Sequence, residues 1–376
     1  MRILFCRSNP IAPDPRVEKE ARALAGDGHQ VAVLGWDRSG ELPEREEDAD
    51  FQVFRLRIKA GYANGIGNLP QLLKWELGLM RWLIVHRKEY DAIHACDFDT
   101  ILPCLFAKWL FKKKVIYDIF DFYADHLRRT PQIIIRIIRS VDLWAIGQAD
   151  AVIIVDDARV KQIEDSSPRK LIVIYNSPED QSAVEYEENF FSPSSKLKLT
   201  YVGLLQVERG LFEMLAVLKK HPEWELNLAG FGGDEQQLVD MAKDMPNVNW
   251  HGRVAYPKAL QLSRAADVLF ATYDPSIPNH AYSSPNKIFE AMMLGKPLIV
   301  AHDTNIDSIV ERHHNGLVVE YGNVQELENA LSLLTDLAQR ELMGGNSRRA
   351  YEDEYGWGKM KDKLSALYRE AARPSG

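Results

Sequence analysis

Short apolar runs alternate with stretches of helical pattern along almost the whole chain, and this alternation restricts the possible folds more than any other feature. In the first half, six such runs are bounded by turn residues, as buried strands are. Between the first two, the stretch PRVEKEARALAGDGH predicts a helix with Pro at its start and Gly at its end. A parallel sheet covered by helices on both faces is therefore expected. The six runs are 2–6, 30–36, 92–96, 114–120, 151–156 and 171–176.

A second series of the same kind occupies the rest of the chain. Between the two series, residues 177–196 lack a clear period and are rich in Ser, Pro and acidic residues, which predicts a linker. We expect an α/β protein with two doubly wound, Rossmann-like domains, 1–185 and 196–350, that face a central cleft. Ligands of such sheets bind beyond the carboxyl ends of the strands. The runs of the second series are 197–203, 224–230, 248–252, 266–273, 297–301 and 316–320.

The composition narrows the class of protein further. A formal net charge of −8 over 376 residues argues against a general nucleic-acid binder. The three cysteines have neither metal-like spacing nor an even number for disulfides, which fits a reducing compartment. No apolar run approaches the roughly 20 residues that span a bilayer, and the opening MRILFCRSNP is broken too early for a signal peptide. We therefore expect a cytoplasmic protein.

The charge is unevenly distributed. Residues 51–140 contain 15 Lys and Arg against 8 Asp and Glu. Within this window, 69–88 and 127–140 mix Trp, Leu and Ile with Arg and Lys, as do basic amphipathic helices that lie on anionic membranes. The window therefore raises an anionic membrane as a partner and a peripheral location at the inner face of the membrane. Core-facing helices with a solvated basic face explain the same pattern.

The segment SSPNKIFEAMMLGKPLIVAH, residues 283–302, places polar residues at the start of an apolar helix. Ser284 suits the N-cap and Pro285 the first helical position, so that Asn286 and Lys287 fall in the first turn. An anion is favoured there by free N–H groups and the helix dipole. Glu290, one turn after Asn286, could bind the hydroxyls of the same ligand. A capped helix with a solvated Glu290 is the alternative.

Two earlier strand ends carry further candidate groups. Gly203 ends one strand, and Arg209 stands at the entrance of the next helix, where its guanidinium could bind a diphosphate. In LAGFGGDEQQL, Gly232 and its neighbouring glycines permit a close approach of backbone N–H groups to a ligand. A surface arginine and plain turns are the alternatives. Together with Lys287 and Glu290, these groups match a nucleoside diphosphate joined to a sugar.

The chain resembles the GT-B-fold glycosyltransferases of family 4, a large retaining family, over nearly its whole length. The resemblance rests on DPRVEKEARALAGDGHQVAVLGW, DAIHACDFDTILPCLFAKWLFKKKVIYDIFDFYAD, YVGLLQVERGL, LAGFGG and, most specifically, SSPNKIFEAMMLGKPLI. It implies that Glu290 holds the ribose, that Asn286, Lys287 and Arg209 lie at the diphosphate, and that Arg253 and Val254 lie beside the nucleobase. It also implies that a C-terminal helix, about 357–372, packs back onto the first domain.

The chain departs from the family at three positions. Tyr282 stands where the family has another glutamate, and Leu204 replaces a usual arginine that would contact the diphosphate. Phe120 occupies the place of a usual histidine, which puts the usual catalytic contact to the donor sugar in doubt. Lys287 could compensate for the arginine missing at position 204.

Polar residues also gather at the predicted strand ends of the first domain. A ring of carboxylates there could accept a proton from an acceptor hydroxyl or hold a sugar, although helix caps and loop hydrogen bonds explain each one equally well. Asp97 and Asp121 are the preferred catalytic pair, because both follow strands that should point into the cleft. We expect no metal requirement, with cations and the helix dipole stabilising the leaving diphosphate. The residues expected on the acceptor side are Asp14, Arg16, His94 and Asp118.

The sequence thus predicts a retaining glycosyltransferase that moves a sugar from a UDP- or GDP-sugar to a hydroxyl acceptor. A lipid-linked or cell-surface glycan is the favoured acceptor, because the first domain is basic and contains Trp. A nucleotide-sugar epimerase with the same fold is one alternative. A degenerate partner subunit that binds nucleotide sugar without turnover is another, and the three departures make it possible.

Overall fold

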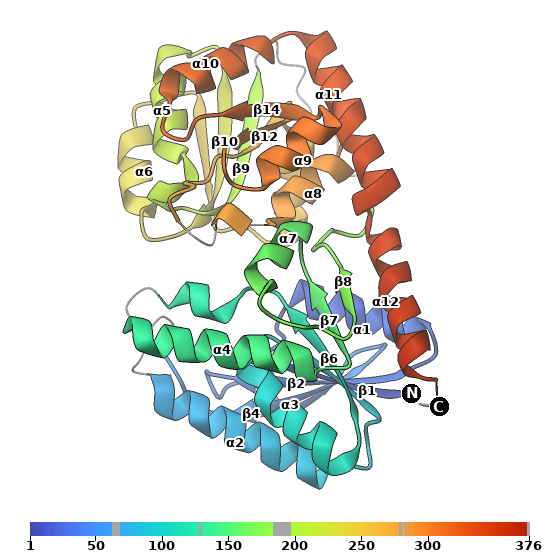
Figure 1. The fold of residues 1–376 in the computed structure, drawn as a ribbon. Helices are drawn as coiled ribbons and strands as arrows, with labels where there is room; N and C mark the ends of the chain where they lie inside the picture. The colour runs from blue at the N-terminus through green and yellow to red at the C-terminus, as the bar shows by residue number, and fades with distance from the viewer. Residues whose placement is uncertain (62–67, 128–129, 183–196, 278–279, 283, 374–376) are drawn as a thin grey trace. The chain divides into compact units, whose positions relative to one another are not determined.

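The computed structural model describes residues 1–61, 68–127, 130–182, 197–277, 280–282 and 284–373. The chain forms two compact units (Figure 1), one of residues 1–175 and 360–376 and the other of residues 176–359. The predicted linker, which ends at residue 196, falls largely outside the described residues. None of the described helices combines the length and the apolar character needed to cross a membrane.

The first unit is built on an eight-stranded sheet with the order β3-β4-β2-β1-β5-β6-β7-β8. All neighbouring strands are parallel except β3 and β4. The six predicted strands are present, and the sequence analysis missed β3 and β4 at the sheet edge. The strands are β1 (Arg2–Arg7), β2 (Gln30–Asp37), β3 (Arg45–Glu47), β4 (Gln52–Arg57), β5 (Ala92–Cys96), β6 (Lys114–Ile119), β7 (Ala151–Ile154) and β8 (Leu171–Val173).

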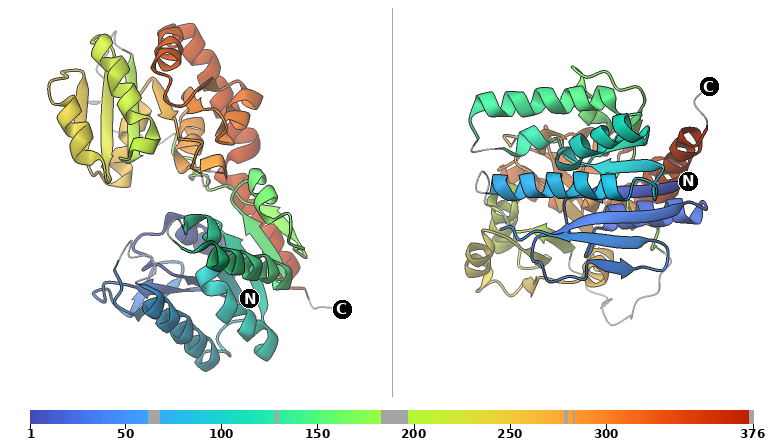
Figure 2. Two further views of the ribbon diagram at one scale, coloured as in Figure 1. Left: turned by 60° about the vertical axis from the view of Figure 1, so that its left-hand side comes forward. Right: turned by 90° about the horizontal axis from the view of Figure 1, so that it is seen from below.

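Helices cover both faces of this sheet. Helices α2 (Leu69–Val85), α3 (Phe98–Phe111) and α4 (Gln132–Gln148) lie over one face (Figure 2) and share one apolar core with it. Helices α1 (Pro15–Gly26) and α12 (Trp357–Ala371) lie over the other face, where Tyr368 of α12 contacts His94 of β5. Because side chains alternate along a strand, His94 points to this face while Ile93 and Ala95 enter the core on the other.

The second unit is built on a six-stranded parallel sheet with the order β11-β10-β9-β12-β13-β14. All six predicted strands of this half are present. The strands are β9 (Lys198–Leu204), β10 (Glu225–Phe231), β11 (Val248–Gly252), β12 (Val268–Ala271), β13 (Leu298–Ala301) and β14 (Gly316–Val319). The helices are α5 (Leu211–Lys220), α6 (Glu235–Ala242), α7 (Tyr256–Ala265), α8 (Asn286–Met293), α9 (Ile306–His313), α10 (Val324–Leu333) and α11 (Leu337–Ala350).

Each unit therefore has the doubly wound architecture that the sequence predicted, with its own apolar core. Chain segments at the first boundary belong to the second unit, since Asp180 pairs with Arg348 and the Tyr351 hydroxyl donates to the Pro178 carbonyl. In parallel sheets of this kind, the loops after the strands carry the ligand-binding groups. The candidate groups of each unit lie in such loops.

Candidate functional site

In the second unit, the segments that follow two adjacent strands, β9 and β12, bring two cations together. Strands β10, β9 and β12 are neighbours in the sheet, so the loops that follow them lie at one edge. Arg209 closes a short 3-10 turn, Val207–Arg209, after β9, and Lys287 lies in the first turn of α8. Both side chains lie against Tyr273, which follows β12: the Arg209 Cζ is 4.3 Å and the Lys287 Nζ 5.7 Å from its ring centroid.

Lys287 is the most unusual group of this cluster. Its Nζ atom is buried, lies 3.5 Å from the centroid of the Tyr201 ring and has no hydrogen-bond partner among the described residues. Burial, the largest cause, and the nearby Arg209 together lower the pKa of Lys287 to about 7, against the opposing effect of Glu290. A buried ammonium group without a hydrogen bond is costly. The Lys287 ammonium group is therefore well placed to bind an anion.

Arg209 adds a second, partly unsatisfied donor. Its Nε is also buried, and no described residue forms a hydrogen bond with it. The electrostatic effect of Arg209 on Lys287 shows that the two positive charges act on each other. Two like charges so close to the same aromatic ring repel each other. A ligand carrying two or more negative charges would relieve that repulsion.

The start of α8 differs from the expectation in one detail. The N-cap is Pro285 in an extended conformation, and no side chain caps the helix, so the predicted N-cap role of Ser284 is wrong. Pro at the cap still leaves Asn286 and Lys287 in the first turn, because the helix begins one residue later than predicted. Asn286 is exposed, and the half-buried Glu290 lies within electrostatic reach of both Lys287 and Tyr273.

The glycines of the loops have different roles. At Gly203, with φ of +157°, a Cβ atom would lie 3.2 Å from the Lys287 Nζ, so this position borders the cation cluster directly. At Gly232 a Cβ atom would lie 2.1 Å from the Leu205 carbonyl oxygen. Gly232 is thus required for the packing of two loops against each other, which agrees with the plain turn that the sequence analysis gave as the alternative to ligand approach.

Arg253 and Val254 follow β11, the next strand along the same edge. The guanidinium of Arg253 lies over the exposed ring of Phe231, at 4.6 Å from Cζ to the centroid, and Val254 is half-buried. Phe231 ends β10. The structure therefore presents a flat aromatic and guanidinium surface at the strand end where the nucleobase was expected.

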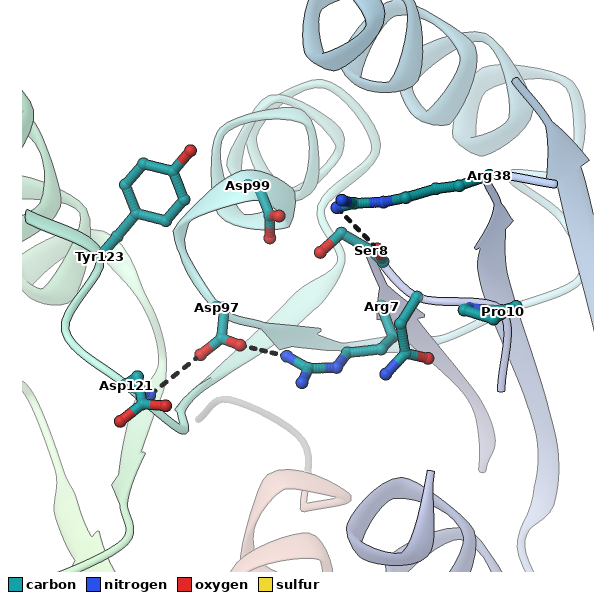
Figure 3. A pocket seen from close by; sticks show the side chains of 9 residues that line it. Arg7, Ser8, Pro10, Arg38, Asp97, Asp99, Asp121 and Tyr123 are labelled. Atoms are coloured by element: carbon teal, nitrogen blue, oxygen red, sulfur yellow. Dashed lines mark hydrogen bonds and ion pairs between the residues drawn. The ribbon is translucent and has the colours of Figure 1, made fainter. Parts of the chain in front are cut away.

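In the first unit, a polar cavity of about 300 Å³ lies at the carboxyl ends of β1, β2, β5 and β6 (Figure 3). Both residues of the preferred catalytic pair line it, as do two arginines and a tyrosine that the sequence analysis did not single out. Those arginines directly follow or end strands β1 and β2, which is the signal that could have identified them. The lining residues are Arg7, Ser8, Asn9, Pro10, Arg38, Asp97, Asp99, Asp121 and Tyr123.

Asp97 connects three strand ends. Its carboxylate is ion-paired with Arg7 and accepts hydrogen bonds from the backbone N–H groups of Phe120, at 2.8 Å, and Asp121, at 3.4 Å (Figure 3). Burial, the largest cause, together with Asp99 and Asp121 raises the pKa of Asp97 to about 6, against the opposing effect of Arg7. Asp97 therefore faces the cavity and also connects the chain segments that form its wall.

Asp121 and Asp99 differ in their surroundings. Asp121 is partly exposed and pairs with the buried Arg159 at 2.7 Å. Asp99 is buried, and its Oδ1 has no hydrogen-bond partner in the described part of the chain, while burial raises its pKa. An unpartnered buried acceptor suits a hydroxyl donor, so Asp99 is a further candidate beside Asp97 and Asp121.

The expected acceptor-side residues lie behind this cavity rather than in it. The Arg16 guanidinium donates to Asp118 at 3.0 and 3.1 Å and lies 3.2 Å from Glu20. His94 approaches Asp118 at 3.3 Å and exchanges a hydrogen bond with the Tyr368 hydroxyl. Arg16, Glu20, His94 and Asp118 are all buried. Their charges are matched inside the unit, and the predicted contact of Arg16, His94 and Asp118 with an acceptor stays a prediction.

Asp14, the remaining acceptor-side candidate, is the N-cap of α1. Its carboxylate accepts from the Val17 N–H at 3.3 Å and from Arg7 and Asn9. It is therefore a structural cap that also positions Arg7, and it does not line the cavity.

One group among the described residues has the composition of a metal site: Glu20, His94 and Asp118. Arg16 lies among these ligands and pairs with both carboxylates. A guanidinium in that position neutralises the charge that a cation would need. The donor set therefore fits a buried ion-pair network better than a metal ion.

Phe120, which replaces a usual histidine of the family, lies beneath two arginines. The Cζ atoms of Arg7 and Arg16 are 4.2 and 4.9 Å from its ring centroid. Phe120 is half-buried, and cation–π contacts of this kind are favourable. The aromatic ring thus belongs to the same charge network that positions Asp97 and Asp118.

Comparison with known proteins agrees with this architecture. The family model described as "Glycosyl transferase 4-like domain" matches residues 13–177, and "Glycosyl transferases group 1" matches residues 197–336. An uncharacterized glycosyltransferase of Haemophilus influenzae is 24% identical over 371 residues, covering 92% of this chain and 93% of that protein.

Two solved structures share the fold across both units. Sucrose-phosphate synthase from Thermosynechococcus elongatus has a TM-score of 0.77 at 18% identity, with 99% of each chain covered. HepE from Anabaena, solved in complex with UDP and glucose, has a TM-score of 0.69 at 16% identity, with 98% of this chain and 99% of that chain covered. The fold class is thus confirmed as GT-B, a glycosyltransferase architecture. The chain belongs to the group 1 glycosyltransferases and is similar to those of family 4. It is therefore a glycosyltransferase enzyme.

Proposed function

We propose that this enzyme is a retaining glycosyltransferase that transfers a sugar from a UDP- or GDP-sugar to a hydroxyl of a lipid-linked or cell-surface glycan. The observation that carries the donor class is the pair of half-buried cations, Arg209 and Lys287, each with one buried nitrogen that has no hydrogen-bond partner among the described residues. A diphosphate supplies the charges and acceptor oxygens that both lack. The UDP complex of the structurally similar HepE supports the same class of donor.

The other residues of the second unit extend this donor site. Glu290 would accept hydrogen bonds from the ribose hydroxyls, and Asn286 would contact the diphosphate from the first turn of α8. The Arg253–Phe231 surface and Val254 would lie against the nucleobase. Transfer would proceed without a metal, because Arg209, Lys287 and the helix start stabilise the leaving diphosphate.

In the first unit, we assign the acceptor to the cavity lined by Asp97, Asp99 and Asp121. Asp121 is the partly exposed carboxylate, and the unpartnered Oδ1 of Asp99 can accept from a sugar hydroxyl. An anionic membrane surface, which would present such an acceptor, is the second partner that we propose.

A sugar-nucleotide panel tests the function as a whole. Thermal shift should identify the donor, since a ligand that binds the native state raises its stability. Product analysis with and without a lipid-linked acceptor, in the presence of EDTA, then separates the possible reactions. Transfer only with acceptor supports the proposal, conversion of free nucleotide sugar identifies an epimerase, and binding without turnover identifies a non-catalytic subunit.

The change Glu290→Ala should weaken nucleotide-sugar binding and leave the fold intact. Loss of a partner for the ribose hydroxyls costs on the order of 1–3 kcal/mol. Isothermal titration measures the affinity, and Glu311→Ala, which removes an exposed carboxylate from the next helix, is the matched control. Affinity equal to that of the wild type would remove Glu290 from the ribose site.

Nucleotide-sugar affinity should fall as the pH rises above about 7. The pKa of Lys287 is lowered to about 7 in the free protein, and a bound diphosphate raises it, because the charged form is then paired. Below that pH the lysine is charged before and after binding. Above it, binding must take up a proton, so the affinity falls by up to about tenfold per pH unit.

Isothermal titration calorimetry in buffers with different ionisation enthalpies measures this proton uptake directly. A nucleotide sugar is the suitable ligand, since its diphosphate diester does not titrate near neutrality. The Lys287→Met variant should bind more weakly and lose the uptake. Proton uptake that persists in this variant would assign the effect to another group.

A further inference from the structure

Helices α2, α3 and α4 expose a continuous apolar surface on the first unit. Their outward side chains include Leu77 and Ile133, each 65% exposed, and Trp109, 53% exposed. Scattered apolar residues are normal on protein surfaces, but contiguous patches mark interaction sites. We call this surface the α2–α4 face. Its large exposed apolar residues are Leu69, Leu73, Leu77, Ile84, Val85, Phe106, Trp109, Leu110, Ile133, Ile134, Ile137 and Trp144.

A groove makes the α2–α4 face continuous across the three helices. It has a volume of about 400 Å³, and apolar side chains dominate its lining. Trp109 of α3 and Trp144 of α4 meet along it, with ring centroids 5.8 Å apart. A groove of this size and chemistry suits a hydrocarbon chain. The lining residues are Leu73, Glu76, Leu77, Met80, Leu102, Pro103, Leu105, Phe106, Trp109 and Trp144.

The exposed charges of the three helices have one sign. Among the described residues of α2, α3 and α4, the exposed charged side chains are Lys74, Arg81 and Arg136, all of them cationic. The acidic residues of these helices, Glu76, Asp99 and Asp142, are partly or fully buried. This distribution is notable in a chain with a net charge of −8. An occupant with an apolar body and an anionic surface is complementary to it.

Several apolar residues of the two basic segments, 69–88 and 127–140, do not lie on this face. Trp75 is fully buried, with its indole N–H donating to the Asp99 carbonyl at 2.9 Å, and Trp82 packs against the core. Ile135 and Ile138 likewise face the core. Arg128 and Arg129 lie outside the described residues.

We propose that the α2–α4 face docks the enzyme on an anionic lipid bilayer, with the groove accepting the hydrocarbon chain of a lipid. Shallow apolar insertion and attraction between cations and anionic headgroups act together in such binding. The proposal deepens the membrane partner proposed above, and its test does not depend on sugar transfer.

Vesicle flotation tests the docking. The wild type should float with phosphatidylcholine vesicles that contain phosphatidylglycerol and stay unbound with phosphatidylcholine alone. Binding should fall as NaCl increases from about 0.1 M to about 1 M, because the Debye length shrinks from about 10 Å to about 3 Å. A wild type that never floats overturns the proposal.

Two sets of variants locate the surface. Lys74→Gln/Arg81→Gln/Arg136→Gln should weaken binding to anionic vesicles on the order of 100-fold. Lys219→Gln/Lys243→Gln/Lys359→Gln, which changes three exposed lysines outside these helices, is the control. An equal loss in the control would show that net charge, and not this face, drives binding.

The apolar contribution needs its own pair of variants. Leu77→Ser/Trp109→Ser/Ile137→Ser, one change per helix, should abolish flotation. Leu333→Ser/Leu337→Ser/Leu342→Ser changes leucines of the second unit that are 47–59% exposed and should float like the wild type. If the first variant turns a dimer into a monomer and the wild type does not float, the face is a contact between copies of this chain, and the proposal fails. Nucleotide-sugar binding, measured for every variant, reports separately on the donor site.

Brominated lipids test the groove. Bromine on the acyl chains should quench the fluorescence of Trp109 and Trp144, and the Trp109→Phe/Trp144→Phe variant should lose that quenching while still floating. Quenching that is absent in the wild type, or unchanged in the variant, would show that no lipid chain enters the groove.

Discussion

Replacing Arg209 and Lys287 together with Ala should reduce transfer to the level of the assay background. Each cation stabilises the charge that develops on the leaving diphosphate, and the loss of one such group typically lowers kcat by about 10²–10³. The two side chains lie over the same ring, that of Tyr273, and influence each other electrostatically. The single variants should therefore retain measurable turnover, and the double variant should retain far less than either.

The departure at Leu204 provides a gain-of-function control for the same prediction. Leu204 is exposed at the end of β9 and follows Gly203, which borders the Lys287 Nζ. Leu204→Arg would restore the arginine usual in the family and should recover part of the activity of Lys287→Ala. Lys219→Ala controls for loss of a surface charge. A double variant with near-wild-type turnover would remove both cations from the site.

All twelve predicted strands are present, and most were predictable because they combine a buried apolar run with turn residues at its ends. Parallel strands covered on both faces are apolar throughout, whereas the edge strand β11, VNWHG, has only exposed and half-buried residues. Of the two missed strands, β3 is the fully exposed edge strand, and β4 lies between β3 and β2. An edge strand needs no apolar run, so its sequence, REE, shows no strand pattern.

The candidate site was predictable only in part. The position of Lys287 in the first turn of α8 followed from the helix start, but its burial against Tyr201 did not. That contact depends on packing between β9 and α8, which are separated by more than 80 residues in sequence. Likewise, Trp75 and Trp109 look alike as aromatic residues among basic ones, yet one is fully buried and the other is 53% exposed.

The charged residues of the first unit show most clearly that the sequence did not predict how deeply a side chain is buried. Arg16, His94 and Asp118 follow or border strands that point toward the expected site, and strand-end position alone made them candidates. Their actual surroundings depend on α1 and α12 closing over them, with Tyr368 supplied from the C-terminal end of the chain. Position along a strand indicates an edge of the sheet, while the depth of a side chain below that edge depends on the tertiary packing.

The change Arg16→Met should destabilise the first unit by about 3–5 kcal/mol, because it leaves Asp118 and Glu20 buried without their cation. Arg16 also donates a hydrogen bond to the Ile174 carbonyl and lies over the Phe120 ring. No other described residue makes all of these contacts. Arg22→Met is the matched control in the same helix. Arg22 is exposed, its pairs with Glu18 and Asp48 lie at the surface, and its loss should cost less than about 1 kcal/mol.

The pH dependence of this loss identifies its cause. In the wild type, burial raises the pKa of Asp118, but Arg16 and His94 outweigh burial and lower it overall; burial raises the pKa of Glu20. Without Arg16, both carboxyl pKa values should exceed their unfolded values, so the folded variant binds more protons and its stability falls as the pH rises through those values. Urea unfolding should therefore show a larger difference from the wild type at about pH 8 than at about pH 5. A loss that is the same at both pH values would show that Arg16 acts through packing, with no uncompensated carboxylates left behind.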